Sequence, residues 1–265
     1  MSYYGQVHGA FTCCGRRSIL EKALFWDFDG TLVLPDSKWS KSLHEAITYL
    51  NYDVSIEEIR SHMLTGYTWH TPELAYPDDT GPKWWDKLFR HFDALYEKHA
   101  VTKADAQSIN QSLRNQILNC KSYTLYADTI PVLRSCMEMG YKNYILSNNF
   151  PELSAVIKDL GLSEYFLEYI VSASVGYEKP RTELFQYALE IAHHPEICYM
   201  IGDNPIADIQ GGRSAGMKTI LVHRDGAFDA DDTCDSLSEI PPLLTLWTAT
   251  RQAKFRAKEH LHRKE

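Results

Sequence analysis

The sequence lacks a long apolar run and a cysteine framework, and each absence argues against a class of protein. No apolar stretch reaches the roughly 20 residues of a membrane-spanning helix. Residues 1–18 contain no continuous apolar segment of the kind found in signal peptides. None of the six cysteines belongs to a Cys-x-x-Cys pair, and Cys136 and Cys198 lie in apolar segments, where a free thiol packs as a small hydrophobe. We therefore expect a cytoplasmic protein in a reducing compartment, without membrane attachment.

Basic residues are also too few for a broad nucleic-acid-binding surface. The chain has 27 Lys and Arg against 35 Asp and Glu, a net charge of −8, so we expect no nucleic-acid partner. An acidic protein can still bind a phosphate ester when a metal ion and a few cations are gathered in one cleft. The 265 residues are enough to bury a large core.

Short apolar segments that alternate with helical patterns define the fold class. The predicted strands are 24–26, 144–146, 169–171, 198–201 and 219–222. Gly140, Gly161 and Gly216 each follow a predicted helix, at the position of a left-handed C-cap. Strands that are apolar throughout indicate a parallel sheet covered on both faces. The sequence therefore predicts a doubly wound α/β fold.

A long helical insertion separates the first predicted strand from the others. Within it, Trp85, Leu88, Phe92 and Tyr96 recur at three- and four-residue spacing, which predicts one amphipathic helix over 85–96. We predict four parts: an N-terminal arm, 1–20; an α/β core, 21–36 and 121–245; a helical cap, 37–120; and a helical C-terminal tail, 246–265.

Polar side chains follow four of the strands, at the edge where open α/β sheets bind ligands. They are Asp27 and Asp29 after the first strand, Ser147, Asn148 and Asn149 after the second, Lys179 beyond the third, and Asp203 and Asp208 after the fourth. Several carboxylates in one place repel each other unless a cation neutralises them. Oxygen ligands without His or Cys point to Mg²⁺.

These residue types suit phosphoryl transfer. Asp27 can attack phosphorus as a carboxylate nucleophile, and Asp29 can serve as general acid and then base. Ser147 and the backbone N–H of Asn148 can bind the phosphate, because a helix begins there. Lys179 supplies positive charge.

The four motifs, Asp27-Phe28-Asp29-Gly30-Thr31-Leu32, Ser147-Asn148-Asn149, Lys179-Pro180 and Gly202 to Asp208, resemble those of the haloacid dehalogenase superfamily over residues 22 to about 245. The resemblance implies a Rossmann-like core with a helical C1-type cap that sets substrate choice. It also implies Mg²⁺ bound by the side chains of Asp27 and Asp203 and the main-chain carbonyl of Asp29. Asp208 would then orient the metal's waters, and Thr31 would support Asp29 and the phosphate site.

Within the superfamily we favour an Mg²⁺-dependent hydrolase of a small phosphate monoester: a nucleotide, a sugar phosphate or a phosphoglycolate-like acid. Asp29 argues against a dehalogenase and a phosphonatase, whose motifs differ at that position. A sugar phosphomutase shares all four motifs and stays an alternative. A non-catalytic protein that retains the fold is a second alternative.

An aromatic cluster in the insertion has two interpretations. Its members could form the core of the cap, or a stacking surface for a flat leaving group. We favour the first for the cluster as a whole, and expect Trp69 and His70, in the middle of the loop, to face substrate. The cluster consists of Tyr67, Trp69, Tyr76, Trp84 and Trp85.

Overall fold

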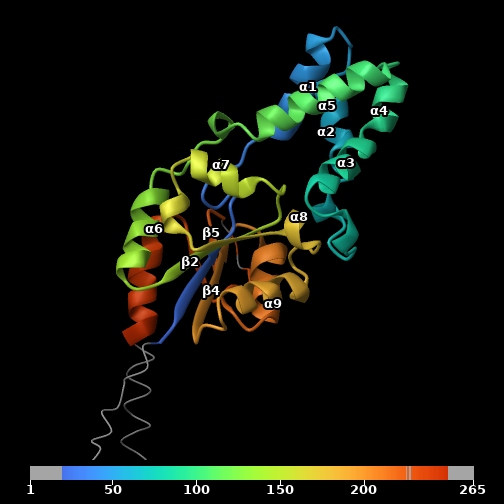
Figure 1. Cartoon of the computed structure of the whole chain (residues 1–265). Helices are drawn as coiled ribbons and strands as arrows, with labels where there is room; N and C mark the ends of the chain where they lie inside the picture. Colours follow the sequence, from blue (N-terminus) through green and yellow to red (C-terminus); the bar gives the residue numbers. More distant parts are fainter. Residues whose placement is uncertain (1–19, 225, 227, 250–265) are drawn as a thin grey trace, which may run out of the picture.

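The computed structural model describes residues 20–224, 226 and 228–249. Its centre is a sheet in which all neighbouring strands are parallel, in the order β3-β2-β1-β4-β5-β6 (Figure 1). The strands are β1 Lys22–Trp26, β2 Lys142–Ser147, β3 Glu168–Val171, β4 Ile197–Gly202, β5 Lys218–Val222 and β6 Asp232–Cys234. The doubly wound α/β fold and its five predicted strands are confirmed. β6 was missed because Asp-Thr-Cys contains no apolar run.

Both faces of the sheet are buried. Leu24 and Trp26 of β1 belong to a core shared with α6 (Thr129–Glu138), α7 (Leu153–Asp159) and the helix 240–249. Ala23 and Phe25, which point to the opposite face, pack instead with α9 (Thr182–Ile191). Helices on both faces explain why apolar residues follow one another along these strands and do not alternate with polar ones.

The order of the strands fixes where a ligand can bind. From β1 the chain runs outward to β2 and β3, and then crosses to the other side for β4, β5 and β6. Trp26, the last residue of β1, pairs with Ile145 of β2 and with Ile201 of β4. The reversal lies between β1 and β4, and crevices at such reversals are the ligand sites of open α/β sheets.

The insertion between β1 and β2 is helical and lies beyond the carboxyl ends of the strands (Figure 1). Its helices are α1 Lys38–Tyr49, α2 Ile56–His62, α3 Pro82–His91, α4 Asp93–Lys98 and α5 Lys103–Ile117, with short 3₁₀ turns at Thr68–His70, Pro77–Asp79 and Cys120–Ser122. The single helix predicted over 85–96 was wrong. Phe92 N–H bonds to Phe89 O, three residues back, which closes α3 with a 3₁₀ turn before α4 begins.

The insertion is also attached to the core away from its two chain connections. We call residues 72–81 the docking loop. Tyr76 N–H donates to Gly176 O at 2.8 Å, and Gly81 N–H donates to Ala173 O at 2.9 Å. Both acceptors belong to the turn formed by α8 (Ser172–Val175) and Gly176. Gly176 has a φ of +90°, and a Cβ there would lie 2.6 Å from Pro77 Cα, so only glycine allows this approach.

The ends of the chain are described in part. Residues 240–249 are helical, while the remainder of the predicted tail and nearly all of the predicted N-terminal arm lie outside the described residues. Within the described ranges, no helix combines the length and the hydropathy needed to span a bilayer. The remaining helical turns of the core are Pro205–Gln210, α10 Gly211–Ser214, Ser163–Tyr165 and Leu237–Glu239.

Candidate active site

A cavity of about 510 Å³ lies between the carboxyl ends of the strands and the helical insertion. Its wall brings together most of the predicted site residues: Asp27, Asp29, Ser147, Asn148, Lys179, Asp203 and Trp69. The insertion contributes Lys38, Trp39, Trp69 and Pro72 to the wall. Strand ends that lie far apart in the sequence therefore meet in one cavity, as the sequence predicts.

Lys179 is the charged centre of this cavity. It is 2% exposed, and its Nζ donates to Leu146 O at 2.9 Å and to Asp208 Oδ1 at 2.5 Å, with Asp27 Oδ1 at 2.9 Å. Burial alone would lower the pKa of Lys179, but the carboxylates of Asp208 and Asp27 outweigh burial and raise it above its ordinary value. Lys179 therefore holds a permanent positive charge against Asp27.

Asn148 fixes the backbone around that lysine. Its Nδ2 donates to Lys179 O at 3.0 Å, and its Oδ1 accepts from Lys179 N–H at 2.7 Å. The peptide bond from Lys179 to Pro180 is cis. These two hydrogen bonds fix the orientation of the Asn148 side chain, and the backbone N–H of Asn148 is a further donor available to a phosphate.

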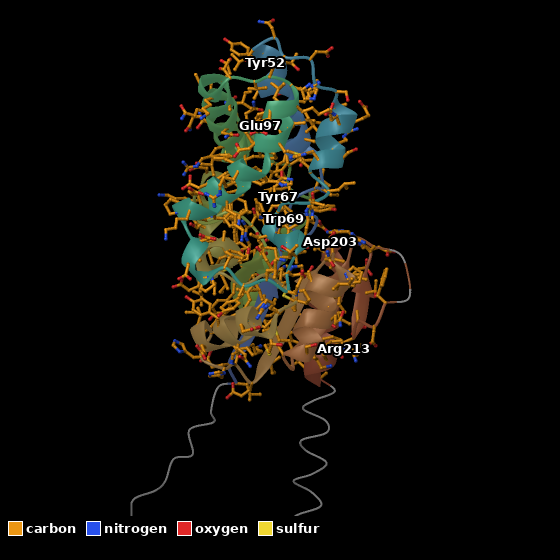
Figure 2. All side chains as sticks on the ribbon, turned by 90° about the vertical axis from the view of Figure 1, so that its right-hand side faces the viewer. Tyr52, Tyr67, Trp69, Glu97, Asp203 and Arg213 are labelled. Carbon is orange, nitrogen blue, oxygen red and sulfur yellow. The ribbon has the colours of Figure 1, made fainter. Side chains whose placement is uncertain are left out.

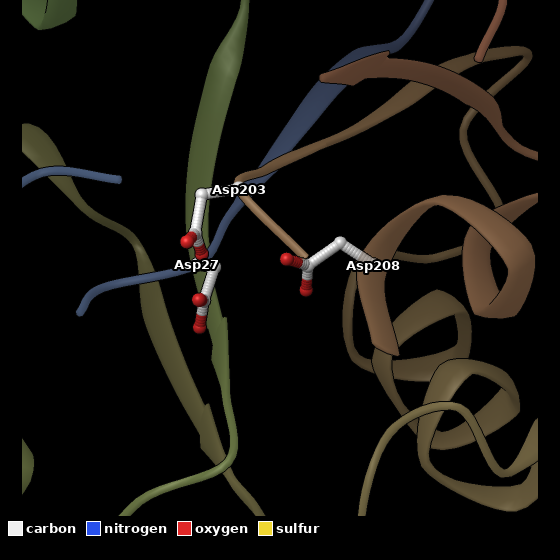
Figure 3. A group of neighbouring side chains, drawn as sticks. All are labelled: Asp27, Asp203 and Asp208. Carbon is white, nitrogen blue, oxygen red and sulfur yellow. The ribbon is translucent and has the colours of Figure 1, made fainter. Parts of the chain in front are cut away.

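Three carboxylates meet beside Lys179. Oxygen atoms of Asp27, Asp203 and Asp208 all lie within 4.8 Å of one another, and Figure 3 shows the carboxyl groups of Asp27 and Asp203 side by side, with Asp208 close to them. Burial, together with the neighbouring charge of Asp27, raises the pKa of Asp203 to about 6. Burial also raises the pKa of Asp208, while Lys179 acts in the opposite direction.

This arrangement of carboxylates fits a hard divalent cation. Both oxygens of Asp208 already accept hydrogen bonds, from Lys179 Nζ and from Asn204 N–H at 3.0 Å. Asp27 has a contact with Lys179 on one oxygen only, and Asp203 has a longer one, 3.6 Å, with Arg224. These two side chains are therefore the better placed to bind a cation, which would remove their mutual repulsion. Gly30 permits the close contact, since a Cβ on it would lie 2.7 Å from Asp203 Oδ2.

Asp29 lies two residues beyond Asp27 and faces the cavity. Its Oδ1 accepts from Lys38 Nζ at 2.5 Å, and its Oδ2 accepts from Asn149 Nδ2 at 2.8 Å. We did not predict a role for either donor. Asn149 stands inside the second motif and could have been found there, whereas Lys38 belongs to no motif and is only the first residue of α1.

Of the predicted phosphate-binding residues Ser147 and Thr31, the structure places only Ser147 in the wall of the cavity. Ser147 ends β2 and lines the cavity, with its Oγ 3.5 Å from Asn149 Nδ2. Thr31 does not: it is fully buried, and its hydroxyl has no hydrogen-bond partner. Because Thr31 is not among the residues that line the cavity, the structure gives no support to the predicted phosphate contact of Thr31.

Most of the aromatic cluster is buried and Trp69 lines the cavity, as expected, but His70 does not line it. Tyr67, Tyr76, Trp84 and Trp85 are at most 4% exposed and form the core of the insertion. Trp69 is partly exposed and lines the cavity together with Trp39, which was not predicted. His70 is exposed and is not among the lining residues. Consecutive side chains of a 3₁₀ turn point about 120° apart, so Trp69 and His70 cannot face the same cavity.

Several known proteins that resemble this chain in sequence are named as hydrolases or phosphatases. The chain is 30% identical over 155 residues to human "haloacid dehalogenase-like hydrolase domain-containing protein 3", covering 57% of this chain and 59% of that protein. It is 40% identical over 108 residues to the pyrimidine 5′-nucleotidase YjjG of Escherichia coli, covering 38% and 48%. A phosphoglycolate phosphatase of Aquifex aeolicus is 28% identical over 203 residues, covering 76% and 84%. The chain spans about half the length of several curated relatives that it matches.

Solved structures share the fold. The HAD-hydrolase YfnB from Bacillus subtilis, bound to magnesium, superposes with a TM-score of 0.66 at 21% identity, covering 85% of this chain and 99% of that one. A family model for haloacid dehalogenase-like hydrolases matches residues 21–216. These residues comprise most of the chain and include all four strand ends that line the cavity, so the chain belongs to the haloacid dehalogenase-like hydrolase family.

Proposed function

We propose that the protein is an Mg²⁺-dependent phosphatase that hydrolyses a small phosphate monoester through an aspartyl-phosphate on Asp27. The observation that supports this most directly is the buried contact of Lys179 with Asp27, next to the carboxylate of Asp203. A carboxylate fixed beside a buried cation, in the wall of this cavity, is placed to attack an anionic phosphorus centre.

In the first step, an oxygen of Asp27 forms a bond to phosphorus while the bond from phosphorus to the ester oxygen breaks. Asp29 gives its proton to the departing oxygen, which leaves as an alcohol. Lys179, Ser147 and the backbone N–H of Asn148 bind the phosphoryl oxygens. In the second step, Asp29 takes a proton from water, the water oxygen attacks phosphorus, and Asp27 is released together with inorganic phosphate.

The metal would be held by the carboxylates of Asp27 and Asp203 and by the main-chain carbonyl of Asp29, with Asp208 fixed behind them. When bound, Mg²⁺ neutralises charge on the phosphoryl oxygens. The magnesium named with the B. subtilis structure supports this choice. The relatives named as phosphoserine, phosphoglycolate and pyrimidine nucleotide phosphatases support a small monoester as substrate.

The helical segment 37–120 would act as a cap on the core, 21–36 and 121–245. It closes the cavity opposite the strand ends, excludes water from the reacting phosphate and selects the leaving group. The cysteines in the described part of the chain, Cys120, Cys136, Cys198 and Cys234, are free thiols, which agrees with the cytoplasmic location that we propose.

The decisive measurement is phosphate release from a panel of monoesters, with Mg²⁺ and with EDTA. We expect release to require Mg²⁺, and Asp27→Asn to lower kcat by about 10⁶-fold, as loss of a covalent nucleophile does elsewhere. The control is Asp53→Asn, which removes an exposed carboxylate of the insertion. Phosphate release that persists in EDTA or in Asp27→Asn would refute the proposal.

A further inference from the structure

The part of the cavity wall that belongs to the insertion is aromatic. Of its four residues, Trp39 and Trp69 present indole rings, and Pro72 is apolar. Figure 2 shows Trp69 at the lower end of the insertion, close above Asp203 of the core. A leaving group attached to a phosphate at Asp27 and Asp203 can extend towards the two indoles, which line the same cavity.

Both indoles are held in place from behind. Trp69 stacks on Tyr67, with ring centroids 4.4 Å apart and an interplanar angle of 15°. Trp39 meets the same tyrosine edge-on at 5.2 Å and also contacts Trp84 and Trp85. The two indoles stand 6.0 Å apart at 60° to each other. They form a rigid corner that can take a flat ring against one face, at a low cost in side-chain entropy.

Charge in the cavity argues against an acidic leaving group. Among the described residues that line the cavity, the cations are Lys38 and Lys179. Lys38 is bound to Asp29 at 2.5 Å and lies 3.4 Å from Asp36, and Lys179 is bound to Asp27 and Asp208. Lys179 binds the phosphoryl group in the proposed mechanism and Lys38 is paired with Asp29, so a carboxylate on the leaving group would find neither lysine free and would face the carboxylate of Asp36.

A sugar phosphate makes little use of the aromatic part of the wall. Sugar hydroxyls need hydrogen-bond partners, and the ring faces of Trp39 and Trp69 and the side chain of Pro72 offer none. The faces of a planar base need no such partner, so a base suits this surface. The ribose of a nucleotide can lie beside Asn149 and Asn204, which are polar residues of the same cavity.

We propose that the substrate is a nucleoside monophosphate whose base stacks in the corner between Trp39 and Trp69. This inference rests on the proposed phosphatase function and narrows its substrate class. The volume of about 510 Å³ lies within the range of cavities that enclose small organic ligands. The similarity to a pyrimidine 5′-nucleotidase is consistent with this class.

The test compares two esters that differ only in the base. We would measure kcat/KM of the full chain with Mg²⁺ for uridine 5′-monophosphate and for ribose 5-phosphate, with phosphoglycolate as the acidic ester. We expect the nucleotide to exceed ribose 5-phosphate by roughly tenfold or more, because stacking of one base on an aromatic side chain is worth about 1–3 kcal/mol. Phosphoglycolate should be the poorest of the three.

Variants of Trp39 and Trp69 test whether these two residues cause the preference for the nucleotide over ribose 5-phosphate. Trp69→Leu and, separately, Trp39→Leu should each lower the ratio of nucleotide to ribose 5-phosphate by roughly tenfold, and Trp69→Phe should restore most of it. The matched control is Tyr49→Ala, which removes an aromatic ring that is 84% exposed on α1 and should leave the ratio unchanged. Since the comparison of esters in the unaltered protein is itself a test, a variant that fails to fold does not decide the outcome.

Three results would overturn the inference while the phosphatase function stands: ribose 5-phosphate as good as the nucleotide, phosphoglycolate as the best ester, or both tryptophan variants lowering all esters in equal proportion. A different result would overturn the function as well. That result is phosphate release from none of the esters, or release that Asp27→Asn does not abolish.

Discussion

Lys38 is the residue whose position has the clearest chemical consequence. Its ammonium lies 2.5 Å from Asp29 Oδ1 and 4.4 Å from the centroid of the Tyr123 ring, and the side chain is 7% exposed. Asp29 is thus held from two directions, by Lys38 and by Asn149 Nδ2. Because Lys38 begins α1, the proposed acid/base takes its orientation from the insertion as well as from the core.

We predict that Lys38→Met lowers kcat/KM for alkyl phosphates by about tenfold or more, a part of the 10²–10⁴-fold that general acid catalysis contributes. The same variant should have a much smaller effect on p-nitrophenyl phosphate. Nitrophenolate departs without a proton, so it does not depend on the orientation of Asp29. The measurement is kcat/KM, which reports the steps up to transfer of the phosphoryl group to Asp27.

The control for this prediction is Lys41→Met, which removes an exposed lysine from the same helix. Lys38→Arg, which keeps the charge, should recover part of the activity towards alkyl phosphates. An equal loss with both leaving groups would show that Lys38 supports the fold and does not position Asp29.

Among the elements, the docking loop is one of the places where the insertion is attached to the core. Two backbone hydrogen bonds join it to the turn after β3. Two further contacts cross the same boundary: Tyr76 OH donates to the buried carboxylate of Glu178, and Arg181 donates to Glu73 O at 2.5 Å. Burial raises the pKa of Glu178, and the hydrogen bond from Tyr76 partly offsets the cost of burying it.

We predict that Gly176→Ala detaches the docking loop. The new Cβ would lie 2.6 Å from Pro77 Cα, closer than nonbonded carbon atoms approach, so the loop has to move away. The expected results are a several-fold lower kcat/KM and faster proteolysis within residues 72–81. Stability should also fall by about 1 kcal/mol, because an L side chain is strained at this positive φ.

The variant Gly161→Ala separates the loss of stability caused by a strained backbone from the loss of activity caused by detachment of the docking loop. Gly161 has a φ of +75°, but a Cβ there would meet nothing within 4 Å. It should therefore lose a similar amount of stability, measured by urea denaturation, without loss of activity. Equal activity of the two variants would show that the docking loop is not needed for catalysis.

At the scale of the whole molecule, the sequence predicts those features of the fold and the site that depend on residues adjacent in the chain. The strand ends were placed correctly because apolar runs and the polar residues after them are adjacent in sequence. Lys38 and Trp39 were missed because their position depends on how α1 packs over the core, which no local pattern records. The burial of Thr31 was not predicted, because the direction of a side chain after a glycine turn depends on the backbone angles of that turn.

The carboxylates of the site should make the protein less stable without metal than with it. At a Mg²⁺ concentration 100-fold above the Kd, binding adds about 2.7 kcal/mol to the free energy of unfolding. We predict that Asp203→Asn unfolds at a higher temperature than the unaltered protein in EDTA, because it removes the repulsion with Asp27. The variant should lose both the Mg²⁺-dependent rise in melting temperature and the activity.

The matching control is Asp159→Asn, at the exposed end of α7 and not among the residues that line the cavity, and calorimetry with and without Mg²⁺ provides the measurement. If Asp203→Asn kept the full shift on adding Mg²⁺, the carboxylate of Asp203 would not be a ligand of the ion.

The central position of β1 also determines when the site can form. Trp26 pairs with Ile145 and with Ile201, which are distant in the chain, whereas the helices of the insertion pack mainly against one another. Contacts between distant residues form slowly, and chains are made from the N-terminus onward. During synthesis the insertion can therefore fold while β1 still lacks both neighbours, and Asp27 meets Lys179 and Asp203 only after the ribosome has passed β4.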